Sequence, residues 1–95
     1  MSYSQKVVIH SKSGTMSPLD ELVEQFIADG VRFIAVVGAE CALIEDIIDE
    51  LVVGDGSREA RFILTSSHPG EPLDEVVQFA RAIREGVGEP QVVEL

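Results

Sequence analysis

The sequence predicts a small three-layer α/β/α domain built on a four-stranded parallel sheet. Four short apolar segments alternate with three longer segments in which apolar residues recur at helical spacing, and glycine or proline residues separate them. Such β-α-β-α-β-α-β alternation favours parallel strands joined by right-handed crossover helices. Because 95 residues are close to the usual size of one hydrophobic core, we expect residues 1–95 to form a single domain.

The first strand is predicted at residues 7–9, and a polar loop follows at residues 10–16. A helix then begins, with Ser17 suited to the N-cap, Pro18 to the first helical position and acidic residues to the first turn. Its apolar residues lie on one helical face; they are Leu19, Leu22, Val23, Phe26 and Ile27. Gly30 is the expected end of this helix, because glycine readily adopts a left-handed conformation.

The second strand is predicted at residues 31–37, the most apolar run of the chain, which only Arg32 interrupts. A strand that does not alternate between apolar and polar residues is typical of burial on both faces of a sheet. The second helix follows Cys41 and ends at Gly54. Its expected apolar stripe is Leu43, Ile44, Ile47, Ile48, Leu51 and Val52.

The third strand is predicted at residues 62–64 and is followed by a loop at residues 65–70. The third helix begins near Pro72 and extends to Gly86; its expected apolar stripe is Leu73, Val76, Val77, Ala80 and Ile83. Residues 91–95 form the fourth strand, which we expect at an edge of the sheet because it contains Glu94.

We expect the strand order 2-1-3-4, which is common in small doubly wound domains of the flavodoxin-like or Rossmann-like type. In this order the loops that contain His10 and His68 are neighbours, and Cys41 lies at an edge. The apolar second strand favours another order, in which it lies between the first and third strands. Cys41 would then lie between the two histidine loops.

The composition indicates which partners the protein can have. With 17 acidic and 7 basic residues the net charge is −10, which argues against nucleic acids and anionic membranes. The acidic residues lie mostly on the predicted helices, as expected of a solvated surface, although they could also attract a basic protein. A homo-oligomer that pairs through the edge strand is a further possibility.

The N-terminal residues and the single cysteine lead us to expect a cytoplasmic protein. The chain begins without a signal-peptide hydrophobic region, and one cysteine cannot form an intramolecular disulfide. The longest apolar stretch, residues 33–39, is too short to span a membrane.

Two loops are candidate anion-binding sites. Hydroxyls, backbone N–H groups and a lysine before a helix could together hold a phosphate or a carboxylate. The candidate residues are Ser11, Lys12, Ser13, Gly14 and Thr15 in the first loop, and Ser66 and Ser67 in the third. Neither the Walker A nor the G-x-G-x-x-G pattern is present. The first loop resembles the phosphate loop of flavodoxins but departs from it at Met16, and no cofactor is expected.

His10, Cys41 and His68 are the candidate catalytic residues. A cysteine at the start of a helix can form a reactive thiolate, and a nearby histidine can act as its base. Alternatively, Cys41 is a small buried hydrophobic residue, and the histidines are polar residues of a strand end and a turn. The short ligand spacing of zinc sites is missing, so no metal is expected.

The function that the sequence favours is a non-catalytic binding or regulatory module that uses the C-terminal edge of its parallel sheet. Its partner would be a basic protein or a small anionic ligand. One alternative is a small thiol-dependent enzyme with Cys41 as nucleophile and His10 or His68 as base. Another is an acidic inhibitor, of the immunity-protein type, that binds a basic protein.

Overall fold

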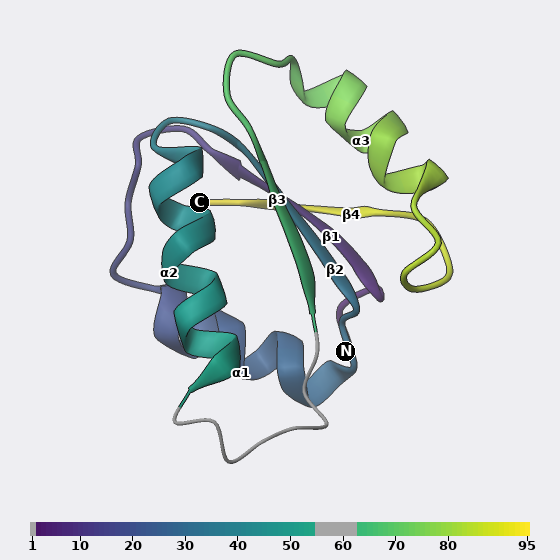
Figure 1. Ribbon diagram of the computed structural model, residues 1–95, viewed down its shortest axis with the longest axis horizontal. Coiled ribbons are helices and arrows are strands. Elements are labelled where there is room, and N and C mark those ends of the chain that lie inside the picture. The colour runs from purple at the N-terminus through teal and green to yellow at the C-terminus, as the bar shows by residue number, and fades with distance from the viewer. Residues whose placement is uncertain (1, 55–62) are drawn as a thin grey trace.

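The predicted α/β fold is confirmed by a computed structural model, which describes residues 2–54 and 63–95 (Figure 1). Within these residues, three helices alternate with four strands. In chain order they are β1 (Lys6–Ser11), α1 (Leu19–Asp29), β2 (Phe33–Gly38), α2 (Cys41–Val53), β3 (Leu64–His68), α3 (Leu73–Ala82) and β4 (Gln91–Glu94).

The four strands are parallel and lie in the order β3-β2-β1-β4, so the expected order 2-1-3-4 is wrong. The pattern of β2 explains the difference. Its residues from Phe33 to Val37 are all buried, and a strand that is apolar on both faces is most stable between two other strands. The expected edge position of β4 is confirmed.

The helices cover the two faces of the sheet unequally (Figure 1). From β1 through β2 to β3 the chain moves in one direction across the sheet, so right-handed crossovers place α1 and α2 on one face, the two-helix face. The return from β3 to β4 runs the other way and places α3 on the opposite face, the α3 face. Phe26, Ile44 and Ile9 are in the core of the two-helix face, and Val8, Val37 and Val76 are in that of the α3 face.

A single helix does not fully cover the α3 face. Helix α3 packs mainly against the central strands β1 and β2. Side chains of the outer strands on this face are therefore only partly covered: Ser66 of β3 is half-buried, and Val92 of β4 is 40% exposed. Both edges of the sheet thus present an accessible surface on the α3 face.

Several element boundaries differ from the expected ones. Strand β3 extends to His68, so residues 65–68 lie in a strand and not in a loop, while Phe62, the expected start, lies outside the described residues. Strand β1 likewise continues through His10 to Ser11. Ser17 does not cap α1, whose N-cap is Pro18. Helix α3 ends at Ala82, before the expected Gly86. Leu43, expected in the buried stripe of α2, is exposed.

A buried lysine holds the C-terminal end of α3 against the sheet. Lys6 is almost fully buried, and its Nζ donates hydrogen bonds to the carbonyl oxygens of Arg81 at 3.1 Å and Ile83 at 2.7 Å. The last carbonyl groups of a helix have no partner within the helix, so a lysine ammonium can satisfy them and interact favourably with the helix dipole.

Candidate functional site

The two histidines lie in one row of residues that crosses the sheet near its carboxyl edge. The strand register places Glu94, His10, Val37 and His68 side by side in that order. Because neighbouring strands are about 4.8 Å apart, the backbones of His10 and His68 are roughly 10 Å apart, with Val37 between them. The histidines therefore share the α3 face but belong to two separate groups of side chains.

The first group contains His10, Lys12 and Glu94, where β1 meets β4. His10 Nδ1 lies 2.7 Å from Glu94 Oε2, and Lys12 Nζ lies 2.6 Å from Glu94 Oε1. The hydrogen bond from Lys12, and after it the one from His10, hold the pKa of Glu94 below its usual range. The chain direction across the sheet reverses between β1 and β4, which is where open α/β sheets form a crevice for ligands.

The loop after β1 uses its polar groups within the protein. The backbone N–H of Gly14 donates to Ser11 Oγ at 3.0 Å, Ser13 Oγ lies 2.9 Å from Thr15 Oγ1, and Lys12 is paired with Glu94. An anion at this loop would have to compete with these contacts.

The carboxyl end of β1 packs closely on the carboxyl end of β2. The N–H of Ala39 donates to the Ser11 carbonyl at 2.9 Å, and a Cβ at Gly38 would collide with that same oxygen. Gly38 has a φ of 100°, which residues other than glycine rarely adopt. The contact fixes the carboxyl ends of β1 and β2 relative to each other.

Cys41 lies apart from both histidines. It is the first residue of α2, as expected, but it is only 4% exposed and packs in the core of the two-helix face. His10 and His68 lie on the opposite face of the sheet. The structure therefore does not bring the thiol within reach of either imidazole. Glu40, just before Cys41, has a φ of 55° and so stores some backbone strain at this turn.

The second group joins Ser66, His68 and Glu71 by hydrogen bonds. His68 Nε2 lies 2.8 Å from Ser66 Oγ, and His68 Nδ1 lies 3.0 Å from Glu71 Oε2. Only 6% of His68 is exposed, and its ring meets the edge of Phe79 at a centroid distance of 4.9 Å. Ser66 is thus brought next to a histidine.

Glu71 was missed in the sequence, and Ser67 does not belong to this group. The turn after β3 brings Glu71 back to His68, with Gly70 at a φ of 76°. The sequence signal that could have identified Glu71 is its position three residues after His68, with Pro-Gly between them. Ser67 pairs in register with Val36, a residue of the core of the two-helix face, and so lies on that face.

Strand β4 leaves its outer backbone groups facing away from the sheet. Leu95 N–H donates to the His10 carbonyl, and Lys12 N–H donates to the Leu95 carbonyl, so the peptide groups of Leu95 face β1. Because alternate residues of a strand direct these groups to opposite sides, Val93 also faces β1, whereas Val92 and Glu94 face outward.

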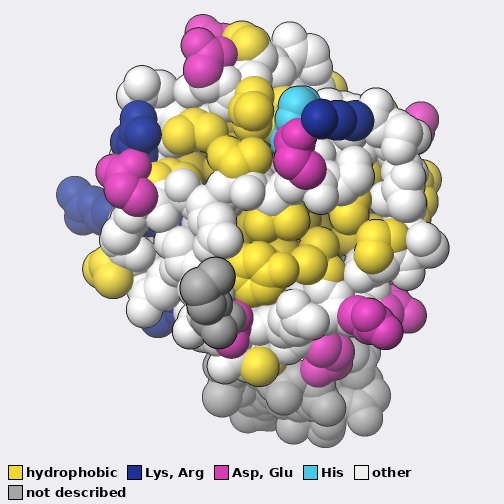
Figure 2. Space-filling model, turned by 180° about the vertical axis from the view of Figure 1, so that it is seen from behind, with side chains coloured by type: hydrophobic (Ala, Val, Ile, Leu, Met, Phe, Trp, Pro, Cys, Tyr) yellow, Lys and Arg dark blue, Asp and Glu magenta, His cyan; other side chains and the backbone are white. Residues whose placement is uncertain are grey.

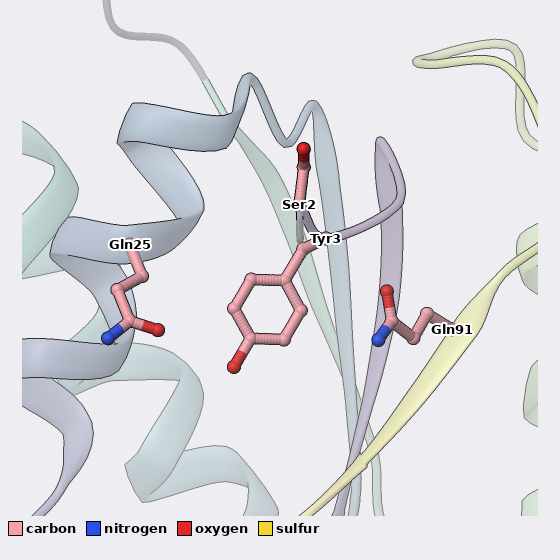
Figure 3. Close-up of a pocket in the computed structure, with 4 residues that line it drawn as sticks. All are labelled: Ser2, Tyr3, Gln25 and Gln91. Atoms are coloured by element: carbon pink, nitrogen blue, oxygen red, sulfur yellow. The ribbon is translucent and has the colours of Figure 1, made fainter.

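Both apolar and polar side chains surround β4, in which Val92 and Val93 lie between Gln91 and Glu94. Figure 1 shows β3 in front of β4, so Figure 2, seen from behind, looks onto the β4 side of the molecule. It shows hydrophobic side chains on both sides of a group formed by a histidine, a lysine and an acidic residue. A shallow pocket of about 220 Å³ lies beside β4, where the Tyr3 ring stands between Gln25 of α1 and Gln91 of β4 (Figure 3).

Residues 2–54 and 63–95 contain neither a cluster of metal-ligating side chains nor a helix that could cross a membrane. Within these ranges, no three or more histidine, cysteine, aspartate or glutamate side chains gather closely enough to hold a metal ion. None of the helices in the same ranges has the length and apolar character needed to cross a membrane.

Comparison with known proteins gives a match to a family of domains. The sequence model of a family described as "Domain of unknown function (DUF7684)" matches residues 4–93. No curated protein and no solved structure matches the chain. The match spans nearly the whole chain, and what the domain does has to be inferred from its geometry.

Proposed function

We propose that this chain, which belongs to the DUF7684 family of domains of unknown function, is a small binding module that pairs β4 with β4 of a second copy. The observation that carries the proposal is the open β4 edge, with outward backbone groups at Val92 and Glu94, an exposed Val92 side chain on the α3 face and a partly buried Val93 side chain on the two-helix face. An edge strand with these properties is a template for another strand.

Two copies of β4 can pair antiparallel in a register that gives hydrogen-bond partners to the outward N–H and carbonyl groups of Val92 and Glu94. If Val92 of one copy lies opposite Glu94 of the other, these two residues exchange both hydrogen bonds, and the two-fold axis repeats the exchange. The two Val93 side chains then meet at the axis on the two-helix face. Glu94 does not face its own equivalent, so this register avoids a repulsive pair of like charges.

The local charge favours a second copy over a basic protein. The chain has a net charge of −10, which opposes close approach of two copies in general. At the β4 edge, however, the Glu94 carboxylate is already paired with Lys12 and His10. A basic partner would gain little electrostatic energy at this neutralised edge, whereas a second copy would meet little repulsion.

The loop after β1 supports protein binding more than nucleotide binding, although the strand order is that of a nucleotide-binding sheet. The order β3-β2-β1-β4 is that of the first four strands of Rossmann-like dinucleotide-binding sheets. The glycine fingerprint that holds a pyrophosphate is missing after β1, and the hydroxyls and lysine there are already engaged. We propose a Rossmann-like domain without a nucleotide, located in the cytoplasm because its single cysteine has no disulfide partner within the chain.

The matched pair Val92→Asp and Val87→Asp tests the proposal by sedimentation velocity over a wide concentration range. Val92 lies in β4 and Val87 before it; both are exposed valines, at 40% and 72%. We expect wild type and Val87→Asp to form a dimer and Val92→Asp to remain a monomer, because only Val92→Asp adds a charge to the pairing edge. Added salt is expected to strengthen the dimer by screening the net charge.

Three outcomes would overturn this function. They are a wild type that stays monomeric at every concentration, a dimer that Val92→Asp does not weaken, and a complex with a basic protein that salt dissociates. The last outcome would restore the acidic surface as the docking site.

A further inference from the structure

We propose that Ser66, His68 and Glu71 form an acyl-transfer site that hydrolyses esters with a short apolar acyl group. The site lies on β3, at the opposite edge of the sheet from β4. It therefore goes beyond the proposed pairing function and can be tested independently of it.

The hydrogen bonds fix which nitrogen of His68 is the base. Glu71 Oε2, 3.0 Å from Nδ1, can only accept a hydrogen bond when the carboxyl group is ionised, so the ring proton is held on Nδ1. Nε2 then carries the lone pair and accepts the hydroxyl proton of Ser66, whose Oγ is 2.8 Å away. Serine, imidazole and carboxylate are thus connected in the order that activates a nucleophilic serine.

The imidazole is held rigidly. His68 is almost fully buried, Phe79 contacts the ring edge, and the backbone N–H of Glu71 donates to the His68 carbonyl at 3.3 Å. Glu71 contacts the ring and not the substrate, so it acts as a positioning residue.

The serine is accessible because α3 packs mainly over the central strands. Ser66 is half-buried and pairs in register with Ala35 on the α3 face. Leu64 on the same strand is half-buried, and Phe79 on α3 is 42% exposed. These apolar side chains match a short apolar acyl group.

The open edge also supplies a backbone donor. Leu64 N–H donates to the carbonyl of Arg32, the residue before β2, so by alternation the peptide groups of Ser66 face β2 and those of Ser67 face the open edge. The N–H of the residue after a nucleophilic serine is a common donor to the oxyanion.

The reaction balances with water as the only co-reactant. Ser66 Oγ forms a bond to the ester carbonyl carbon while its proton moves to His68 Nε2, and the tetrahedral intermediate then expels the alcohol, which takes that proton from Nε2. Water attacks the acyl-enzyme in the same way, giving its proton to Nε2. The acid is released as Ser66 recovers the proton.

The test combines a fluorophosphonate probe, which labels activated serines, with hydrolysis of p-nitrophenyl acetate. We expect one adduct, mapped to Ser66 by mass spectrometry, and a loss of at least about 100-fold in hydrolysis for Ser66→Ala. Ser17→Ala is the matched control, since it removes an exposed serine before α1 that lies outside the proposed site, and it is expected to keep the wild-type rate.

Glu71→Gln tests the positioning role and covers the case in which Ser66→Ala fails to fold. Its carboxylate is half exposed, so the fold is expected to tolerate the change. The amide favours the wrong tautomer of His68, so kcat is expected to fall at least about tenfold with KM unchanged. The absence of any adduct, an adduct at another residue, or wild-type hydrolysis by Ser66→Ala or Glu71→Gln would overturn the proposal.

Discussion

His10 and His68 lie in the same row of the sheet, yet their surroundings give them different roles. His10 shares the Glu94 carboxylate with Lys12 and is partly exposed, so its contacts are those of a surface ion-pair cluster. His68 is buried, and both of its ring nitrogens have partners, a carboxylate and a serine hydroxyl. Burial and partner identity, and not residue type, separate the two.

Glu94→Gln is expected to change how stability depends on pH. Lys12 and then His10 lower the pKa of Glu94 in the folded protein. The ionised group therefore stabilises the fold above its unfolded pKa, and this contribution is lost as the pH falls through the lower folded pKa. We expect the difference in unfolding free energy between wild type and Glu94→Gln to be largest near neutral pH and to shrink on acidification.

Denaturant unfolding at a series of pH values measures that difference, with Glu50→Gln as the control on the exposed surface of α2. The explanation fails if the difference in unfolding free energy between wild type and Glu94→Gln is the same at every pH.

At the scale of the elements, Lys6 joins β1 to the end of α3. The substitution Lys6→Met replaces the lysine by an apolar side chain of similar length. It therefore leaves the carbonyl groups of Arg81 and Ile83 without their hydrogen-bond donor. We expect a loss of about 1–3 kcal/mol in unfolding free energy. Lys12→Met, whose ammonium is largely exposed, is the control and is expected to cost about 0–1 kcal/mol. If both variants lose the same unfolding free energy, the hydrogen bonds from Lys6 to the end of α3 do not stabilise the fold.

Proline substitutions distinguish the two sides of β4. The N–H of Val92 faces outward and that of Val93 faces β1, so Val92→Pro removes no hydrogen bond of the monomer, whereas Val93→Pro removes one. We expect Val93→Pro to lose about 1–3 kcal/mol in urea unfolding at low protein concentration, and Val92→Pro to lose much less. The reverse ranking would mean that the outward direction is assigned to the wrong residues.

Each element could be predicted from the sequence because it follows local patterns: apolar spacing in the helices and Gly or Pro between the segments. The extent of β3 could not. Thr65, Ser66 and Ser67 are typical of a loop, and they form a strand because an edge strand under an incompletely covered face tolerates polar side chains. The central place of β2 was indicated by its two-sided apolar pattern, although 2-1-3-4 is a common order in small doubly wound domains.

The candidate sites depended on contacts that local patterns do not encode. His10 and His68 were identified in the sequence, but their partners Glu94 and Glu71 depend on strand register and on one turn. The separation of Cys41 from the histidines follows from the handedness of the crossovers, which puts α2 on the face opposite α3.

At the scale of the whole molecule, three helices on four strands leave the sheet unevenly covered. Two helices cover one face and one helix covers the other, so both outer strands are accessible on the α3 face. We assign different roles to the two edges, self-association to β4 and acyl transfer to β3. Pairing through β4 would produce a continuous sheet of two copies with the Ser66 sites at its far ends.

Amide hydrogen exchange at β4 tests this assignment most directly. We expect the N–H groups of Val92 and Glu94 to exchange more slowly as protein concentration rises, because pairing protects them, while Val93, protected by β1 in both states, is unaffected. Fast exchange at Val92 and Glu94 at every concentration, or a change spread over the whole sheet, would contradict pairing through β4.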